Sequence, residues 1–556
     1  MRLFGRVNTQ VTNEDRPFLF AGTIFTLAYR LPVGSVPISG ALLPPVFNLS
    51  PPLAMFVMDV YDGSILADWT EAEDVTFGTN EHGFAELRGR YPMNLYQAFT
   101  FYNLNDPPHL VVTDGLKKVY EGRLEDIGID EQGVAFGAFG YWRALSDLRV
   151  SALFADSDLS NWYSLTDDEV AGVVLDRFEV DKYNRLYAAP KKDETYSSAT
   201  AYCSFGYRVP DLSLTQIERV VFNFAFDMPS PWKVELARCD ADWSELSVVW
   251  SLTGNGSLQS GTGHAVDVSP CDALRFTLFY NGTSATYTGE SGDDYFRLTN
   301  LVVSAFDATD VYADDIMKVL VEEISTRNPS QLSADTSQIQ SPGLALADAI
   351  YEDERPADIA NQLSVLGDDQ DVPQPWTAAV WEDRRLQFAP KGERANHWYV
   401  DVASLQIERS FQDVVNTAYG VYRENGRGNR RTAEASSGLS EVVRMEAVDT
   451  TTTSAGTAVV HRDAYLSDSS VTRPRATLRT LGLFDEMGAQ HPLYRARAGD
   501  YLTLRNLPPD LGELNNLRTF RIGSTRYNAA TDELEPEPET SIPSLAILVA
   551  RREQGV

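Results

Sequence analysis

Two pairs of closely spaced carboxylates are the clearest candidate ligands for a metal ion. Asp156 and Asp158 precede a segment of strand-like runs, and Asp293 and Asp294 lie near its end. Clustered carboxylate oxygens at the edges of loops are the ligands that Ca²⁺ prefers. Solvated loop carboxylates would give the same pattern, so the sequence leaves the binding of calcium open. We expect no other cofactor.

Five aromatic residues in the same segment have the chemistry to contact sugars, namely Trp162, Tyr163, Trp232, Trp243 and Trp250. Exposed aromatic rings can stack on sugar rings, whereas the same rings buried in a β core supply a large apolar area. Their spacing along strand-like runs favours the core. Binding of a host glycan is the alternative.

No familiar catalytic motif occurs in the sequence. The chain lacks a P-loop, an H-E-x-x-H motif, a G-x-S-x-G elbow and a Rossmann glycine fingerprint. Carboxylates are abundant enough to form a glycosidase-like pair by chance. Histidines occur without metal-ligand spacing at His82, His109, His264, His397, His461 and His491. We therefore predict that the protein is not an enzyme.

The charge of the chain disfavours binding to nucleic acid. Its 556 residues include 79 Asp and Glu against 47 Lys and Arg, which gives a net charge of −32. Binding to nucleic acid depends largely on cationic contacts to phosphate. An acidic wall would repel DNA and so suits a conduit better than a binder. Plain solubility explains the same charge equally well.

Cysteine usage and hydropathy indicate folding in a reducing cytoplasm. Cys203, Cys239 and Cys271 are an odd, sparse set without a C-x-x-C pair, unlike a secreted disulfide framework. The first residues lack the apolar core of a signal peptide. No apolar run is long enough to cross a membrane as a helix. We expect free thiols and no membrane anchor.

The chain is too long for one core, and its patterns divide it into five parts. Residues 1–55, rich in Pro and Gly, predict an extended arm that either packs on a neighbour or forms a leader without fixed structure. Residues 56–152 contain short hairpins and predict a small β-barrel. Residues 153–308 predict an inserted, jelly-roll-like β-sandwich. Residues 309–424 predict an α+β domain, and residues 425–556 a second barrel-like domain. The fold class is therefore mainly β with an α+β part.

The α+β part has the most distinct local patterns. A first helix is indicated by apolar residues on one face, namely Ile316, Val319, Leu320 and Ile324. A second helix has Pro356 in its first turn and Gly367 at its end. A hairpin follows, in which the alternating apolar residues are Trp376, Ala378 and Val380 on one strand and Leu386 and Phe388 on the other.

Several stretches allow comparison with a known family. Between Asp401 and Tyr422 the chain reads D-V-x-S-L-x-I-E-R-S-x-x-D-V-V-N-T-A-Y-x-V-Y. From Val112 it reads V-x-D-G-x-x-x-V-Y-E-G-R-L-E-D-I, followed by G-Y-W-R-A-L, and near the end A-G-D-Y-L-T-L-R-N-L and F-R-I-G-S-T-R-Y-N. Taken in their order along the chain, over residues 56–150 and 310–550, these stretches resemble the tail-tip hub (tail-associated) proteins of siphovirus-like tailed phages. The run F-R-L-T-N-L-V-V-S-A-F resembles the last strand of carbohydrate-binding-like sandwiches.

The resemblance implies a structural protein of the virion. In that family three copies form a ring at the distal end of the tail, duplicated barrels extend the tail tube, and DNA passes through without specific binding. The implied partners are a second and third copy of the chain, a distal tail protein, a tape-measure protein and receptor-binding parts. The chain would be assembled in the host cytoplasm. A glycan-binding host-recognition protein is the second interpretation, and a glycan-degrading tail enzyme the third.

Overall fold

The computed structural model describes residues 17–20, 23–26 and, with internal gaps, residues 53–539. The gaps are residues 105, 116, 166–177, 181–184, 190–194, 197–200, 212, 284, 288–293, 308–309, 347, 370–375, 394, 409–414, 424–428, 438–442, 450–458, 460–461, 464, 467–474 and 506–517. The chain divides into two compact units, Met1–Leu49 and Ser50–Val556. In the first unit, β1 (Pro17–Phe20) and β2 (Thr23–Thr26) form an antiparallel hairpin.

The first β domain contains seven described strands and one helix, α1. Its strands follow the order β4-β3-β7-β8-β9-β6-β5 in the sheet, and neighbouring strands are antiparallel. The turns of two of its hairpins contain Gly115 and Gly133, which have positive φ of 61° and 131°. The elements are β3 (Ala54–Met58), β4 (Ile65–Asp68), β5 (Glu73–Asn80), β6 (Gly83–Tyr91), α1 (Leu95–Tyr102), β7 (His109–Asp114), β8 (Lys117–Asp130) and β9 (Gly133–Gly140).

The second β domain is formed by strands near the end of the chain, together with one strand that the sequence places in the α+β part. That strand is β28 (His397–Glu408), which pairs with β33 and β35. Local alternation could not reveal this membership, because both partners follow it by about 70 residues or more along the chain. The other elements are β33 (Arg475–Phe484), β34 (Gln490–His491), η3 (Leu493–Arg495), β35 (Tyr501–Arg505), β36 (Thr519–Asn528) and β37 (Glu533–Pro538).

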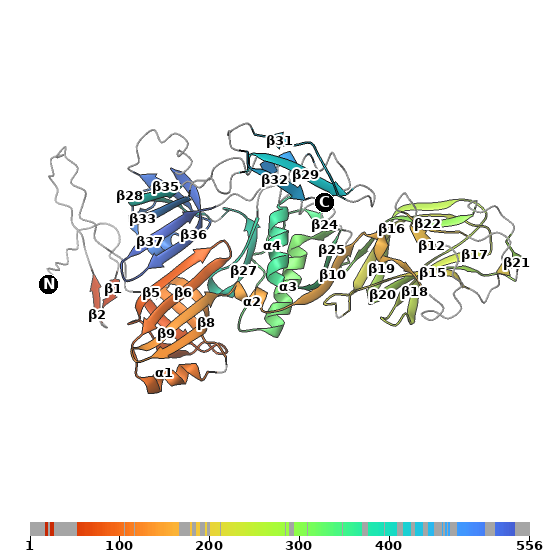
Figure 1. Ribbon diagram of the computed structural model, residues 1–556. Coiled ribbons are helices and arrows are strands. Elements are labelled where there is room, and N and C mark those ends of the chain that lie inside the picture. The colour runs from red at the N-terminus through yellow and green to blue at the C-terminus, as the bar shows by residue number, and fades with distance from the viewer. Residues whose placement is uncertain are drawn as a thin grey trace. The chain divides into compact units, whose positions relative to one another are not determined.

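The two β domains, predicted as separate barrels, belong to one sheet of 15 strands, which also includes β26 and β27 of the α+β part. Strand β5 pairs with β36 in antiparallel register, with Thr79 opposite Thr525, so the first and second β domains lie side by side (Figure 1). They also share a hydrophobic core, in which the Phe77 ring lies 6.1 Å from that of Tyr120 and 5.2 Å from that of Tyr527. Each domain thus covers an edge that the other would leave unpaired.

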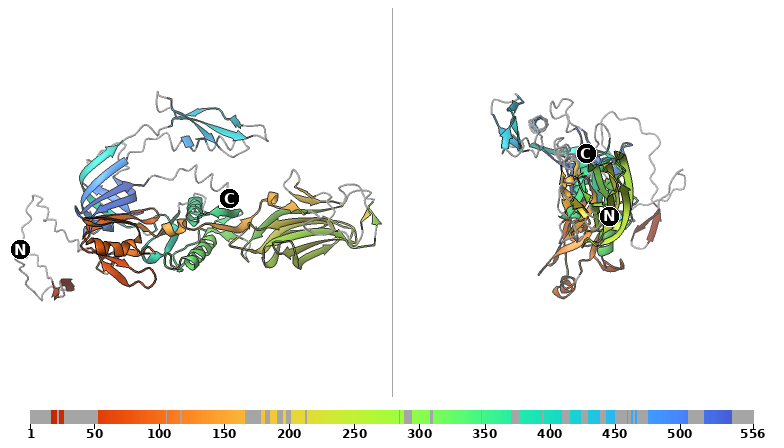
Figure 2. Two further views of the ribbon diagram at one scale, coloured as in Figure 1. Left: turned by 60° about the horizontal axis from the view of Figure 1, so that its bottom comes forward. Right: turned by 90° about the vertical axis from the view of Figure 1, so that its right-hand side faces the viewer.

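Residues between these domains include a β-sandwich with its own core. Two sheets face one another across buried aromatic and aliphatic residues (Figure 2). One sheet has the order β12-β13-β22-β10-β25, with β16 on β22 and β19 on β16; the other has the order β11-β15-β20-β17-β18. The elements are β10 (Val150–Asp156), η1 (Leu159–Asn161), β11 (Tyr163–Ser164), β12 (Phe178–Val180), β13 (Leu186–Ala188), β14 (Thr195–Tyr196), β15 (Ala201–Arg208), β16 (Ile217–Asp227), β17 (Trp232–Cys239), β18 (Glu245–Thr253), β19 (Gln259–Cys271), β20 (Ala273–Tyr280), β21 (Ala285–Thr286) and β22 (Tyr295–Ser304).

The sandwich is joined to the α+β part through β10. This strand pairs with β22 at one end, with Ala155 opposite Ser304, and with β25 along its length. The entry and exit of the sandwich are therefore neighbours in one sheet, as expected for an inserted domain.

The α+β part forms the elements that the sequence predicts. Helix α4 begins with Pro356 in its first turn and ends at Gly367, which has φ 70°. In the hairpin, Val380 pairs with Leu386 and Ala378 with Phe388. The elements are α2 (Arg143–Ser146), β23 (Val311–Tyr312), α3 (Ala313–Arg327), β24 (Ala345–Leu346), β25 (Ala349–Glu354), α4 (Pro356–Leu366), β26 (Trp376–Val380), η2 (Glu382–Arg384) and β27 (Leu386–Pro390).

A small four-stranded sheet lies in the chain between β28 and β33. Strand β29 pairs with β30, β31 and β32, and Ala418, Val448 and Leu466 form its core. The strands are β29 (Thr417–Arg423), β30 (Asn429–Arg431), β31 (Ala435–Ser436) and β32 (Met445–Asp449). Among the described residues, no helix is both long and apolar enough to cross a lipid bilayer.

The junction between β5 and β36 makes a direct prediction about Gly78. A Cβ at this position would lie 2.0 Å from the carbonyl oxygen of Thr525, so Gly78→Ala should separate the two strands. We expect the free energy of unfolding to fall by about 2–3 kcal/mol in urea titrations. Gly128→Ala is the matched control, because its Cβ would meet only atoms of Ala135 at 3.8 Å. Equal stability of the two variants would contradict the close approach.

Candidate functional site

The carboxylates that the sequence offers as metal ligands hold the loop at the entry of the sandwich. Asp156 is buried; its Oδ1 accepts from the backbone N–H of Asp158 at 2.8 Å, and its Oδ2 accepts from Asn161 Nδ2 at 2.8 Å. Burial raises the pKa of Asp156, although hydrogen bonds from Tyr207 and Asn161 oppose the shift. Asp158 caps η1 by accepting from the N–H of Ser160 at 2.8 Å. Both carboxylates therefore have structural partners.

Of the second carboxylate pair, Asp293 and Asp294, the structure describes one residue. Asp293 lies outside the described residues, and Asp294 is half-buried just before β22. Within the part of the chain that the structure describes, no three His, Cys, Asp or Glu side chains gather around a cation-sized space.

Most of the candidate sugar-binding aromatics are core residues. Trp162 and Trp232 are buried, with neighbours that include Tyr207 at 5.3 Å and Tyr196 at 5.0 Å between ring centroids, respectively. Trp243 is also buried and covers Gly206, where an added Cβ would lie 2.3 Å from its ring. These three rings are not sugar platforms, because no open ring face remains.

The other two aromatics differ in exposure. Trp250 is half-buried on the sandwich core, and its ring lies 5.3 Å from Phe222 and 5.8 Å from His264. Tyr163 exposes 39% of its surface beside Trp243, at 5.7 Å between ring centroids. Tyr163 is therefore the most exposed of the five.

A group of polar contacts among the described residues lies instead where the α+β part meets the two β domains. The turn between β26 and β27 carries Asp383 and Arg384 with φ of 63° and 58°, a conformation that costs free energy for residues with a Cβ. Lys118 Nζ donates to Asp383 Oδ1 at 3.0 Å and to Glu121 Oε1 at 3.0 Å. The backbone N–H of Asp383 donates to Glu121 Oε2 at 2.8 Å. The hydrogen bond from Lys118 lowers the pKa of Asp383. Strand β8 thus holds the strained turn.

Arg384 extends this contact to β7 and to the α+β part. Its Nη1 lies 3.3 Å from His109 Nε2 and also donates to the carbonyl oxygen of Ser330. His109 is buried, and burial lowers its pKa from 6.5 to about 4, with the charge of Arg384 as the next cause. The imidazole is therefore neutral at physiological pH and tolerates the guanidinium beside it.

Arg497, from the second β domain, completes the junction. Its guanidinium carbon lies 5.4 Å from the ring centroid of Phe84 and 5.3 Å from that of Trp381, and its Nη2 lies 2.5 Å from Glu382 Oε1. Cation–π contacts of this kind contribute roughly 0.5–2 kcal/mol each. One side chain thus contacts the first β domain at Phe84 and the hairpin turn at Trp381 and Glu382.

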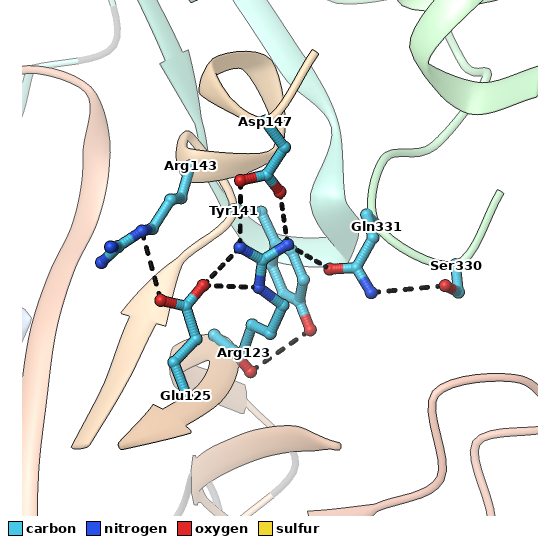
Figure 3. A network of polar contacts seen from close by, with 8 residues as sticks. Arg123, Glu125, Tyr141, Arg143, Asp147, Ser330 and Gln331 are labelled. Atoms are coloured by element: carbon cyan, nitrogen blue, oxygen red, sulfur yellow. Dashed lines mark hydrogen bonds and ion pairs between the residues drawn. The ribbon is translucent and has the colours of Figure 1, made fainter. Parts of the chain in front are cut away.

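A second group of polar contacts joins β8 to α2 and to the loop that follows α3 (Figure 3). Arg123 makes a two-point contact with Asp147, at 2.5 and 3.3 Å, and its Nε donates to Glu125 at 2.7 Å. Its Nη1 also reaches Gln331 Oε1 at 3.5 Å. Arg143 lies 3.2 Å from Glu125 on the other side. Planar Arg–carboxylate pairs fix orientation as well as distance, so this group positions the α+β part on the first β domain.

A cavity of about 270 Å³ lies between the hairpin and the second β domain. Five of its charged lining residues pair with one another: Lys391 and Arg521 contact Glu539, and Arg497 contacts Glu382. The cavity is therefore part of the polar junction, and its geometry gives no separate indication of a ligand.

Sequence patterns located the hairpin turn but not its partners. Lys118, Glu121 and His109 read as ordinary strand residues, and Glu121 is buried in spite of its charge. The one available indication was a carboxylate placed directly between Tyr120 and Gly122, in the run Val119–Gly122 whose four residues are all buried. A buried carboxylate requires a partner, but the sequence does not say which.

Comparisons with known proteins find likeness in structure alone. The chain matches no protein-family profile and no curated protein. It is similar to the 43 kDa tail protein of prophage MuSo2 from Shewanella oneidensis, at 7% identity over 89% of this chain and 98% of that one, with a TM-score of 0.42. It is also similar to the prophage tail protein gp18 from Listeria monocytogenes EGD-e, at 9% identity over 90% of this chain and 99% of that one, with a TM-score of 0.36. A family 29 carbohydrate-binding module is 15% identical over 29% of this chain and 98% of that one, with a TM-score of 0.18.

The environment of His109 predicts that stability depends on pH. Because its folded pKa of about 4 lies below the ordinary value of 6.5, the unfolded chain binds the proton more readily. The contribution of the neutral His109 to the free energy of unfolding is fully present above pH 6.5. It is lost as the pH falls toward 4, by up to about 3 kcal/mol. Urea titrations of wild type and His109→Gln at pH 7 and pH 5 would measure it. We expect the free energy of unfolding to fall more between pH 7 and pH 5 for wild type than for His109→Gln. An equal fall in the two proteins would contradict a neutral buried imidazole.

Proposed function

We propose that this chain is a structural component of a phage virion, and specifically a hub at the distal end of the tail. The stretches that resemble hub proteins now have places in the fold. The stretch from Val112 covers the end of β7 and most of β8, and the two later ones cover β35 and β36. Although nearly 400 residues separate the first of these three stretches from the other two, all three lie in the two β domains that share one sheet. The stretch Asp401–Tyr422 runs instead from β28 of the second β domain to β29 of the four-stranded sheet, with residues 409–414 outside the described part, and G-Y-W-R-A-L ends in α2. Because those three distant stretches meet in one folded unit, their common location supports the resemblance.

The pairing of β5 with β36 is the observation that carries the proposal. It holds two β domains side by side in a single chain. Three such chains would supply six β domains, the number that a hexameric tail tube requires under the resemblance. Closed cyclic symmetry would also pair surfaces that a single chain leaves exposed. We therefore propose a ring of three copies.

The junction around Arg497, Asp383 and Arg123 would make such a ring rigid. Polar contacts join the α+β part to both β domains, and the strained turn at Asp383 is held from two sides. A component that transmits force from the tail tip to the tube needs domains that do not hinge. The same contacts need no substrate, and the proposal assigns no catalytic step to the chain.

The charge of the chain is compatible with passage of DNA through the ring. A net charge of −32 would weaken contacts to phosphate and allow DNA to pass without being held. The neighbouring proteins in this proposal are a distal tail protein, a tape-measure protein and receptor-binding parts.

A ring of three is tested by the mass of the purified protein. We expect light scattering to give three times the chain mass of 61.7 kDa, and images of tail tips to show threefold symmetry. Assembly that needs a neighbouring protein would leave the isolated chain monomeric, so tail tips are the decisive sample. A different rotational symmetry of this protein there would exclude the hub.

The sandwich is proposed as a separate module that ring formation does not need. Asp156 lies opposite Val303 in antiparallel strands, so a two-residue Asn-Gly turn can replace residues 157–302. We expect the shortened chain to fold and to keep the oligomeric state of the full chain. Loss of assembly would show that the sandwich belongs to the core of the hub.

The same shortened chain separates a spacer from a glycan-binding module. If the sandwich recognises a host glycan, full-length protein should bind a panel of host polysaccharides and the shortened chain should not. Tyr163→Ala should then weaken binding about fivefold, since one partly exposed aromatic ring contributes on the order of 1 kcal/mol. Trp232→Phe is the control for a buried ring. Equal binding by all forms would leave the sandwich as a spacer.

A further inference from the structure

Helix α1 presents an uncovered aromatic face. On one side Ala98 is buried and Phe101 packs on Trp69, with ring centroids 5.1 Å apart. On the other side Tyr96, Phe99 and Tyr102 are exposed, Tyr96 to 87%. A surface helix ordinarily directs polar residues to solvent, but Leu95–Tyr102 contains no charged residue. This face has the composition of a buried surface.

Strand β4 ends the large sheet, and Trp69, on which Phe101 of α1 packs, directly follows it in the chain. Among the described residues the strand pairs with β3 alone, and Ile65 and Leu66 are exposed. In the turn between β3 and β4, the hydroxyl of Tyr61 donates to Asp106 Oδ2, just beyond α1, at 2.9 Å. This contact joins the turn to the helix. We call the combined area the α1–β4 surface, formed by Tyr61, Ile65, Leu66, Tyr96, Phe99 and Tyr102.

An open strand edge beside apolar side chains favours one kind of occupant. The unpaired N–H and C=O groups of an edge strand accept another extended segment, and the neighbouring side chains select an apolar one. Natural proteins usually protect such an edge with Lys or Pro, and Ile65–Asp68 has neither. The occupant should therefore be an extended, apolar segment.

Charge narrows the choice of occupant further. Residues 53–81 and 92–108, which carry the surface, contain eight Asp or Glu and no Lys or Arg. The first 52 residues of the chain reverse this balance, with four Arg against two acidic residues. These 52 residues are also rich in apolar and β-branched residues, for example in the runs PFLF and TIFT of the β1–β2 hairpin. The two segments are complementary in charge and in apolar character.

The place where the N-terminal segment joins the described chain permits contact with another molecule. The N-terminal segment, residues 1–52, is followed by Leu53 and then by β3, which is the neighbour of β4. The 27 residues from Thr26 to Leu53 can span up to about 90 Å, well beyond one small domain.

We propose that the α1–β4 surface binds the N-terminal arm, residues 1–52, of a second copy of this chain. The arm adds a strand to the open edge of β4, covers the aromatic face of α1, and sets its arginines among the acidic residues around them. This exchange does not depend on a role in a phage tail.

Hydrogen–deuterium exchange of the full-length protein tests the proposal. We expect amides of β4 to exchange at least about tenfold more slowly at high protein concentration than at low concentration, because the arm arrives from another molecule. Replacing Arg2, Arg6, Arg16 and Arg30 by Glu keeps the arm at full length and should abolish this protection. Protection that does not change with concentration would assign the arm to its own chain and overturn the exchange.

A mixing experiment provides a second, independent test. One chain lacks residues 1–52, and the other carries Tyr96→Glu with Phe99→Glu; each alone should show fast exchange at β4. Mixed, the intact arm of the second chain can reach the intact surface of the first, so protection of β4 in the first chain should return. Leu258→Glu with Met487→Glu, at exposed apolar residues elsewhere, is the matched control and should behave as wild type. Failure of the mixture to restore protection would overturn the proposal.

Discussion

The antiparallel pairing of β5 with β36 is the contact on which the rest of the structure depends. It connects segments that lie 446 residues apart at Thr79 and Thr525, whose hydroxyls lie 2.7 Å from each other and one of which also accepts from the N–H of Ala498 at 2.8 Å. The β domains on either side contribute to one core. The chain between β5 and β36, which includes the sandwich and the α+β part, must therefore leave the joined β domains and return to them. The polar junctions around Arg123 and Arg497 follow from that requirement, because they fix the intervening parts where the chain leaves and returns.

Local elements could be predicted from the sequence because their determinants are local. Pro356 and Gly367 define the ends of α4, and the alternation from Trp376 to Phe388 defines the hairpin. The fold class, mainly β with an α+β part, follows from the same patterns. The shared sheet could not be predicted in this way, since no property of Thr79 indicates a partner near residue 525. Two separate barrels were the natural expectation when each domain was considered alone.

The candidate sites show the same limit in side-chain chemistry. Asp156 and the buried tryptophans have residue types that suit calcium or sugars, yet Asp156 accepts hydrogen bonds from its own loop and Trp162 packs in the core. Residue type determines which ligands a side chain could bind, and burial determines whether a ligand can reach it. Conversely, nothing in the local sequence marks Arg384 or Arg497 as important, because their partners lie on strands hundreds of residues away. The aromatic face of α1 was also missed, because a helix with apolar residues on every side reads as a core helix.

The long separation between β5 and β36 also has a consequence for how the chain is made. At a synthesis rate of about 5–20 residues per second, β36 emerges roughly 20–90 s after β5. Pairing across such a distance must wait for the whole intervening chain, and contacts of high sequence separation form slowly even then. For that interval the first β domain is a nascent fold with an unpaired edge at β5 and an incomplete core. The chain therefore passes through a stage at which it is exposed to mispairing with other nascent copies, and at which a chaperone that covers strand edges would raise its yield.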